Sequence, residues 1–125
     1  MKKQLLFFIP VLIFISIVIL FKAVFFIGYV PTASMAPTLK EGRLIFGMRR
    51  HAALNAGDII VFKHNGEIMV KRIAAVGGQT ITVADKIFII PEDGYFVLGD
   101  NLENSFDSRF WENPFVMKSE VIAKI

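Results

Sequence analysis

The sequence predicts a mainly β protein, a small β-barrel or β-sandwich that follows one N-terminal transmembrane helix. Two observations carry this prediction. The chain is 54% hydrophobic, above the usual range for a soluble domain, and the excess is concentrated at its N-terminus. The remainder consists of short β-rich runs separated by turn signals, which is typical of a small all-β domain. At 125 residues, the chain holds one such domain once the membrane segment is set aside.

Residues 1–30 are predicted to be a cytoplasmic tip and a transmembrane anchor. Leu5–Phe21 carries no charged residue, and after Lys22 the apolar run resumes to Val30. A spanning helix needs about 20 apolar residues. Lys22 can extend its amine toward the membrane surface, and a membrane helix tolerates a proline such as Pro10.

The alternative for this segment is a cleaved signal peptide. Such a peptide has an apolar core of about 7–15 residues followed by a cleavage site with small residues, and this run is longer and ends in bulky ones. An uncleaved anchor is therefore expected. Lys2 and Lys3 precede the run and predict a cytoplasmic N-terminus, so residues 31–125 should form an extracytoplasmic domain.

The first β elements lie in the middle of the chain. Arg43–Arg49 is a short strand candidate. Gly57–Gly78 contains two β-rich runs around Asn65 and Gly66, and an Asn-Gly pair between such runs is a strong hairpin signal.

The later β elements are shorter. Gln79–Ile90 predicts a second hairpin that turns near Ala84 and Asp85. Gly94–Asn101 predicts a strand that ends in a turn, and Lys118–Lys124 predicts a last strand or a short helix.

Composition excludes several classes of function. The net charge of +3 is too small to indicate nucleic-acid binding, and no long basic run is present. The chain has no cysteine, which excludes disulfides, thiolate chemistry and cysteine metal sites. The two histidines, His51 and His64, have polar neighbours in sequence. We therefore expect no metal, no cofactor and no Ser-His-Asp triad.

The stretch "PTASMAPTL" (Pro31–Leu39) follows the apolar run and contains one serine, Ser34. Pro31 and Pro37 fix their own φ angles and favour extended conformations in the preceding residues, so a stiff, non-helical loop is expected. A serine hydroxyl needs a base to act as a nucleophile. Without a suitable histidine, that base would be a lysine whose amine burial keeps neutral. An ordinary linker with a solvated serine is the alternative.

Lys71 is the lysine with the most apolar surroundings, in "IMVKRIAAV" (Ile68–Val76), whereas Lys63 lies beside the predicted Asn-Gly turn. In a strand, Lys71 and Arg72 point to opposite faces. Both faces carry apolar neighbours, so the alternation leaves open which of the two cations is buried.

A polar loop, "GDNLENSFDSRFW" (Gly99–Trp111), follows the last apolar strand. Within it, Asp107 and Arg109 are placed to form a local ion pair, and Ser105 is placed to orient a neighbouring amine. A plain surface turn is the alternative.

Together these stretches resemble type I signal peptidases, the membrane proteases that use a serine and a lysine. The resemblance rests on four segments in the family's order and spacing behind an anchor: "SMAPTL" (Ser34–Leu39), "GDIIVF" (Gly57–Phe62), "VKRIAAVGG" (Val70–Gly78) and "GDNLENSFDSR" (Gly99–Arg109). Any one segment would be weak, because LexA-type autoproteases share a Ser-Met pair and a Val-Lys-Arg. That related class also needs a cleavable segment ahead of the serine, where this chain has its anchor.

The resemblance implies roles for individual residues. Ser34 would be the nucleophile and Lys71 the general base. The oxyanion hole would comprise the N–H of Ser34 and the hydroxyl of Thr32, which stands where family members often carry a serine. Ser105 would hold the Lys71 amine, and Asp107 with Arg109 would form a supporting pair.

This chain departs from the family pattern at several positions. Leu102 stands where the family usually has arginine, Glu103 where aspartate is common, and Glu112 where glycine is usual. Only Gln79–Asp93 separates the lysine segment from the next strand, where larger relatives insert a second β-subdomain. The chain resembles a minimal form with a more open substrate groove.

The implied function is removal of N-terminal signal peptides from exported preproteins by a single-pass enzyme of the inner (plasma) membrane. Its partners would be preprotein signal peptides, often with small residues first and third before the cut, together with membrane lipid and the protein-export machinery. No cofactor is implied. Two alternatives stay open: a non-catalytic, membrane-anchored domain that binds extended peptides, and a peptidase dedicated to one pilin or conjugation substrate.

Overall fold

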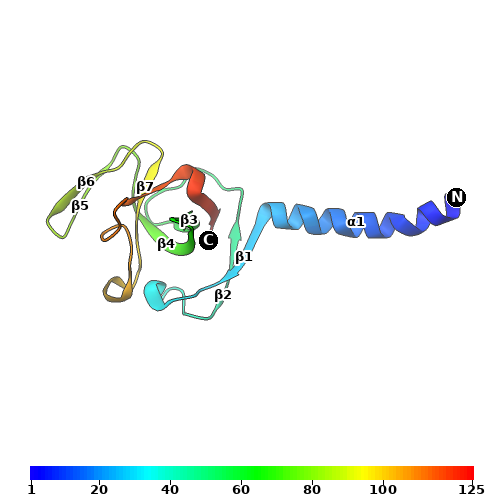
Figure 1. Cartoon of the computed structure of the whole chain (residues 1–125), viewed down its shortest axis with the longest axis horizontal. Helices are drawn as coiled ribbons and strands as arrows, with labels where there is room; N and C mark the ends of the chain where they lie inside the picture. Colours follow the sequence, from blue (N-terminus) through cyan, green and yellow to red (C-terminus); the bar gives the residue numbers. More distant parts are fainter.

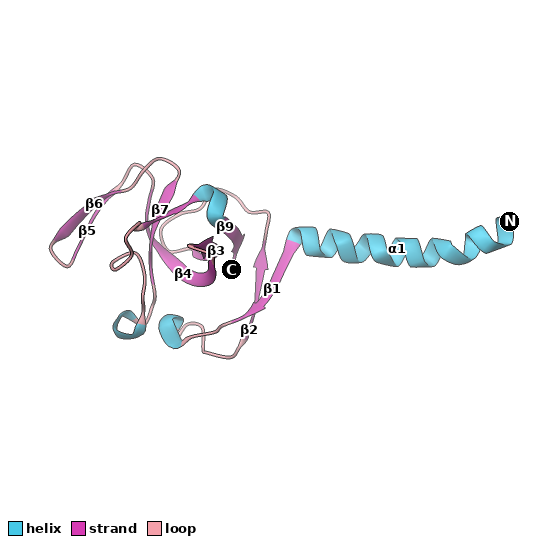
Figure 2. Cartoon of the chain, in the orientation of Figure 1, coloured by secondary structure: helices cyan, strands magenta, loops and turns pink.

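The computed structural model describes residues 1–125. One long helix, α1 (Lys2–Val24), projects away from a β domain that contains the rest of the chain (Figure 1). The helix is long and apolar enough to cross a membrane, and none of its residues is buried in the protein. The predicted fold class, a mainly β domain behind one N-terminal helix, is confirmed (Figure 2).

Seven strands form the main antiparallel sheet, in the spatial order β1-β2-β9-β3-β4-β7-β8. Their bounds are β1 (Phe25–Tyr29), β2 (Leu44–Met48), β3 (Ile59–His64), β4 (Glu67–Val76), β7 (Gly94–Leu98), β8 (Phe115–Met117) and β9 (Val121–Lys124). A separate hairpin of β5 (Thr80–Val83) and β6 (Lys86–Ile89) projects on the side of the domain opposite α1 (Figure 1). Three single 3-10 turns complete the structure: η1 (Ala33–Met35), η2 (Leu102–Asn104) and η3 (Lys118–Glu120).

The turn chemistry of the sequence accounts for both hairpins. Asn65 and Gly66 adopt φ angles of 50° and 82° between β3 and β4, as a tight hairpin turn requires. Ala84 and Asp85, with φ angles of 50° and 65°, do the same between β5 and β6. The segment Lys118–Lys124, predicted as strand or short helix, contains both, since η3 leads into β9.

Two strands differ from the expectation. The helix ends at Val24, and the apolar residues that follow it form β1, which pairs antiparallel with β2. The anchor expected over residues 1–30 is therefore shorter as a helix. Residues 25–29 are apolar on both faces of the strand, so no alternation distinguished them from the helix before them. The short strand β8, at the far edge of the sheet, was not predicted either.

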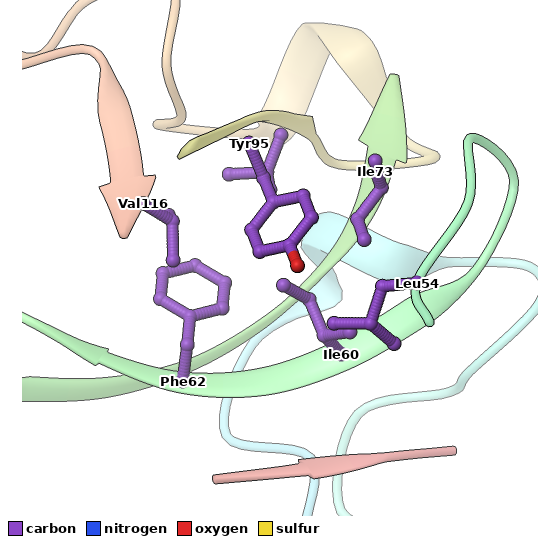
Figure 3. Packing of buried hydrophobic residues seen from close by; sticks show 7 residues of the cluster. Leu54, Ile60, Phe62, Ile73, Tyr95 and Val116 are labelled. Carbon is purple, nitrogen blue, oxygen red and sulfur yellow. The ribbon is translucent and has the colours of Figure 1, made fainter. Parts of the chain in front are cut away.

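The core is divided among three clusters, of which the smallest consists of Ala75, Ile90 and Phe96. The two larger clusters share β3 and β4. Figure 3 shows the first, which gathers Tyr95 and Val97 of β7 and Val116 of β8 over Ile60, Phe62 and Ile73, with Leu54 at its side. The second lies toward β1 and β2 and consists of Val30, Ile45, Val61, Val70 and Ala123. Because β4 contributes to all three clusters, a polar side chain in the middle of this strand is held among packed apolar groups.

Candidate active site

Ser34 lies in the single 3-10 turn η1, directly after β1 and the Pro31 bend. The expected non-helical loop is therefore wrong in detail. Thr32 caps this turn in an extended conformation, and its hydroxyl oxygen accepts a 3.4 Å hydrogen bond from the backbone N–H of Ser34. The side chain of Ser34 is 5% exposed. The turn thus presents one buried hydroxyl at a fixed place.

Lys71 reaches this hydroxyl from the middle of β4. Its Nζ lies 2.6 Å from Ser34 Oγ, and the residue is only 5% exposed. Arg72 points to the other face, where its guanidinium makes two bonds of 2.8 and 2.7 Å to the carboxylate of Asp100. The sequence left open which of the two cations is buried, and in the structure it is Lys71.

Burial also changes the acidity of the lysine. Loss of water around the amine lowers the pKa of Lys71 below its ordinary value. The negative charge of Asp107 opposes this effect, and the positive charge of Arg109 adds to it. The net lowering favours a neutral amine, which can accept a proton from a hydroxyl at 2.6 Å.

Thr32 also contacts the serine. Its hydroxyl donates a 3.1 Å hydrogen bond to Ser34 Oγ while its oxygen accepts from the Ser34 N–H. Two hydrogen-bond donors, the Thr32 hydroxyl and the Ser34 N–H, are therefore close to the Ser34 hydroxyl oxygen.

Asp107 anchors the polar loop behind the lysine. It is completely buried, and its carboxylate accepts hydrogen bonds from the N–H of Gly99, the hydroxyl of Ser105 and the guanidinium of Arg109. The expected ion pair between Asp107 and Arg109 is present at 2.8 Å. The expected contact of Ser105 with the lysine is not: its hydroxyl donates to Asp107 at 2.7 Å, because the carboxylate is the stronger acceptor within reach.

A backbone clamp on the serine turn was missed by the sequence reasoning. The N–H of Asn101 donates to the carbonyl of Ser34 at 2.8 Å, and its side-chain amide donates to the carbonyl of Ala33 at 3.1 Å. Gly99 lies so close to the serine turn and to Ser105 that a Cβ at this position would overlap Ser105 and the Ser34 carbonyl oxygen. The only signal was the Gly-Asp-Asn turn after an apolar strand, which by itself does not name a partner.

His64 has an environment that its sequence neighbours did not predict. It is 2% exposed, stacks on Trp111 with ring centroids 4.5 Å apart, and places its two ring nitrogens 3.3 Å from a Glu120 oxygen and 3.1 Å from the Asn113 carbonyl. Its polar neighbours in sequence are turn residues, whereas its packing partners come from the C-terminal part of the chain. Both ring nitrogens have partners there, and neither contacts Ser34.

A groove with a volume of about 550 Å³ opens beside the serine and the lysine. Its lining residues come from the Pro31 bend and η1, from the first half of β4, and from the polar loop: Val30, Pro31, Thr32, Ser34, Met35, Glu67, Ile68, Met69, Val70, Lys71, Asn104 and Phe106. Along Glu67–Val70, β4 pairs with β3 on one side only, since its pairing with β7 begins at Arg72. The groove is therefore bordered by an unpaired strand edge.

The structure is thus a small β domain behind an apolar helix, and a buried lysine amine lies within hydrogen-bond distance of a serine hydroxyl in the lining of a groove. A sequence model of the family described as signal peptidase, peptidase S26, matches residues 1–90 and 85–125. The chain belongs to this family.

Individual relatives agree with this assignment. The chain is 28% identical over 130 residues to a probable signal peptidase I-2 of Synechocystis sp., covering 77% of this chain and 59% of the relative. It is 27% identical over 132 residues to a signal peptidase I of Leptolyngbya laminosa, covering 77% and 64%. It is also 27% identical over 160 residues to an inactive signal peptidase IA of Staphylococcus aureus, covering 100% and 91%. The chain thus spans about 60% of the length of the two cyanobacterial relatives.

Proposed function

We propose that the protein is a membrane-bound serine endopeptidase that removes N-terminal signal peptides from exported preproteins, with Ser34 as nucleophile and Lys71 as general base. The observation that carries this proposal is the 2.6 Å approach of Lys71 Nζ to Ser34 Oγ, both in buried surroundings. A lysine can serve as a base only as the neutral amine, and burial shifts its pKa in the required direction. The staphylococcal relative is named as an inactive signal peptidase. The presence of both Ser34 and Lys71, in contact, supports an active enzyme here.

The chemistry follows from these positions. Neutral Lys71 takes the proton of Ser34 as Oγ attacks the scissile carbonyl carbon, and the carbonyl oxygen becomes an oxyanion. When the C–N bond breaks, the lysine ammonium returns its proton to the leaving amine, and an ester to Ser34 remains. Lys71 then takes a proton from water, and the resulting hydroxide attacks the ester. Ser34 Oγ takes that proton back from Lys71 as the signal peptide leaves with a new C-terminal carboxylate.

The oxyanion needs two donors close to the serine. The N–H of Ser34 and the hydroxyl of Thr32 are proposed for this role. In the structure, the Ser34 N–H donates to the Thr32 hydroxyl oxygen at 3.4 Å, and the Thr32 hydroxyl donates to Ser34 Oγ at 3.1 Å. Both must turn toward the carbonyl oxygen when substrate arrives, and each such donor contributes about 10²–10³-fold to the rate in other acyl-transfer enzymes.

The substrate would bind as an added strand. The free edge of β4 along Glu67–Val70 offers backbone donors and acceptors beside the groove. An extended segment ahead of the scissile bond can pair with this edge, so that backbone hydrogen bonds supply affinity and the groove selects side chains.

The membrane location rests on two adjacent apolar surfaces. Helix α1 is able to span a bilayer, and β1 continues directly from it. In the β1–β2 ribbon, the cross-strand pairs Phe25–Met48, Ile27–Phe46 and Tyr29–Leu44 share one face and are all exposed. We propose that this ribbon face lies against the lipid and keeps the groove close to the membrane surface, where a signal peptide emerges.

We further propose that α1 crosses the inner (plasma) membrane with Lys2 and Lys3 in the cytoplasm, so that the domain from residue 31 onward is extracytoplasmic and meets preproteins delivered by the export machinery. A reporter enzyme fused after Ile125 should be active only outside the cytoplasm. Activity of the fusion inside the cell would contradict this orientation and, with it, the substrate class.

The proposal is tested by incubating the full-length protein in detergent micelles with a purified preprotein and sequencing the N-terminus of the product. Wild type should release a mature protein cut after a small residue, and Ser34→Ala should release none. Binding of the signal peptide without cleavage by wild type would favour the non-catalytic peptide-binding domain. Cleavage of only one preprotein out of a varied set would favour a dedicated peptidase.

A further inference from the structure

Another pocket, with a volume of about 400 Å³, lies where α1 ends and the β1–β2 ribbon begins. We call it the junction pocket. Its volume is within the range of small-molecule sites, about 300–1,000 Å³. It shares no lining residue with the groove beside the serine and the lysine. The side chains that give it chemical character are three exposed apolar groups of the ribbon and three basic residues: Phe25, Phe46, Met48, Arg50, His51 and Lys124.

The strand pairing places apolar and cationic groups side by side in this pocket. Phe25 pairs with Met48 across β1 and β2, and Met48 pairs with Lys124 across β2 and β9. Directly paired residues point to the same face of a sheet, so this row carries two apolar side chains and one amine on one face. Arg50 follows two residues after Met48, at the end of β2. The pocket therefore matches an amphipathic ligand, with an apolar part and a polar part.

The charges around the pocket decide the sign of the polar part. Lys124 Nζ lies 3.5 Å from a carboxylate oxygen of Asp58, whereas Arg50 takes part in no ion pair. The neighbouring Arg49 is also exposed, and its Nε donates to a backbone carbonyl at the end of α1. Upstream of Asp58, the only acidic residue of the chain is Glu41, which precedes the opposite end of β2. The pocket therefore favours a ligand with negative charge.

The place of the pocket along the chain identifies the kind of ligand. As a helix, the run Leu5–Val24 rises about 30 Å, which equals the thickness of the hydrocarbon core of a bilayer. The strand β1 begins at the next residue (Figure 1), and the N–H of Arg49 donates to the carbonyl of Val24 at 2.7 Å. With α1 across the bilayer, the junction pocket lies at the level of the lipid phosphates. A guanidinium binds phosphate through two parallel hydrogen bonds.

We propose that the junction pocket binds one anionic phospholipid, with the phosphate on Arg50 and the first part of the acyl chains against Phe25, Phe46 and Met48. This inference rests on the membrane location of α1 in the proposed function. A zwitterionic choline headgroup fits less well, because the acid nearest the pocket, Asp58, is already paired with a lysine. The pocket is built from β1, β2 and β9 at the end of α1, so a lipid held there fixes the β domain at one depth in the interface.

The test is native mass spectrometry of the full-length protein in detergent micelles, titrated separately with phosphatidylglycerol and with phosphatidylcholine of the same acyl chains. Wild type should retain one phosphatidylglycerol, with a Kd about 10-fold below that for phosphatidylcholine. In Arg50→Gln this ratio should fall close to one. The matched control is Arg43→Gln, which removes the same charge from an exposed arginine at the other end of β2 and should leave the ratio as in wild type. Circular dichroism establishes that both variants are folded.

A third ligand separates a lipid from a soluble phosphate. Glycerol 3-phosphate carries the phosphate without acyl chains, so it lacks the apolar contacts with the ribbon. It should displace phosphatidylglycerol only at a concentration about 100-fold higher or more.

Three results would overturn the proposal. One is an unchanged ratio in Arg50→Gln, and another is an equal loss in Arg43→Gln, which indicates attraction by surface charge in general. The third is displacement by glycerol 3-phosphate at the concentration of the lipid itself, which indicates a site for soluble phosphate. Lipid binding is measured without a preprotein, so the two proposals fail separately. Arg50-dependent selectivity in a protein that cleaves no preprotein supports the lipid site and rejects the peptidase, whereas cleavage without lipid selectivity rejects the lipid site alone.

Discussion

The serine–lysine site and the β1–β2 ribbon depart from the usual distribution of polar and apolar residues in opposite ways. At the site, polar side chains are buried: Ser34, Lys71, Ser105 and Asp107 are each 7% exposed or less. On the ribbon, apolar side chains are exposed: Phe25, Ile27, Tyr29, Leu44, Phe46 and Met48 are each at least 40% exposed. The two regions are joined by the short stretch between Tyr29 and Ser34.

The difference shows what stabilises each region. A buried polar group costs free energy unless it is hydrogen-bonded, and no buried side-chain nitrogen or oxygen in this protein lacks a partner. The site is therefore stabilised from within, by its own network. The inner face of the ribbon packs in the core, but its outer face has no partner in the chain, so the exposed side chains there are stabilised only by what covers them. Substitutions should act on catalysis at the first region and on membrane contact at the second.

The largest effect is expected from Lys71→Arg. Arginine keeps the charge and much of the length, but its guanidinium does not lose a proton in the working pH range, so no base is available. Loss of a general base costs on the order of 10²–10⁴-fold in rate. The measurement is kcat/KM on a signal-peptide substrate, with circular dichroism to establish that the variant is folded.

The pH dependence of the wild type sharpens this prediction. Only the neutral amine is active, and burial lowers the pKa of Lys71 below its ordinary 10.5. Activity should therefore rise with pH through the weakly alkaline range and level off above the folded-state pKa. A folded Lys71→Arg protein that cleaves at the wild-type rate would remove Lys71 from the mechanism.

Lys71 also shows where prediction from sequence ended. The two hairpins followed from local turn residues such as Asn65 and Gly66, whose conformational preferences act without tertiary contacts. The burial of Lys71 rather than Arg72 depended on Asp100, which lies 28 positions along the chain from Arg72 and captures its guanidinium on the opposite face. Pattern alone contains no information about such a partner.

Other misses have the same origin. The resemblance implied that Ser105 holds the Lys71 amine, whereas in the structure its hydroxyl donates to the carboxylate of Asp107. His64 was assigned polar surroundings from its neighbours in sequence, although Trp111 and Glu120 enclose it from distant segments. The residue types of the site and the pairs Lys71–Ser34 and Asp107–Arg109 were predictable from the resemblance, but the partners of Ser105 and His64 were not.

A smaller loss is expected from Thr32→Val, which keeps the shape of the side chain and removes its hydroxyl. If this hydroxyl binds the oxyanion, kcat should fall about 10²–10³-fold with little change in KM. Single-turnover cleavage measures this directly. A wild-type rate would leave the oxyanion to backbone donors alone and reduce Thr32 to the cap of the serine turn.

Asp107→Asn tests whether the buried network stabilises the site. Burial alone would raise the pKa of Asp107, but hydrogen bonds from Arg109, Gly99 and Ser105 lower it below its ordinary 3.8. A carboxylate with a lowered folded-state pKa stabilises the fold above the unfolded-state pKa, and this stabilisation is lost as pH falls through the folded-state value. Breaking a buried pair costs about 3–5 kcal/mol, so the melting temperature at neutral pH should fall by about 10 °C or more.

Two comparisons control this experiment. Glu103→Gln, an exposed acid in the same loop, should change the melting temperature little. The difference between wild type and Asp107→Asn should close in acid, once the wild-type carboxylate is protonated. Equal stability of the two proteins at neutral pH would show that the network only positions the loop.

The smallest effect is expected on the ribbon, and it separates the two regions most directly. Replacing one exposed apolar residue there should change the free energy of unfolding by no more than about 0.5 kcal/mol.

Contact of the ribbon with lipid is better detected by fluorescence, after Trp111→Phe has removed the native tryptophan. In that background, Phe46→Trp places a probe on the exposed face of β2, and Ile87→Trp places one on β6, at the far side of the domain from α1 (Figure 1). In vesicles whose acyl chains carry bromine, a quencher of indole fluorescence, the probe at position 46 should be quenched and the one at 87 should not. Equal quenching at both positions, or none at 46, would mean that the ribbon faces water and that α1 alone attaches the enzyme to the membrane.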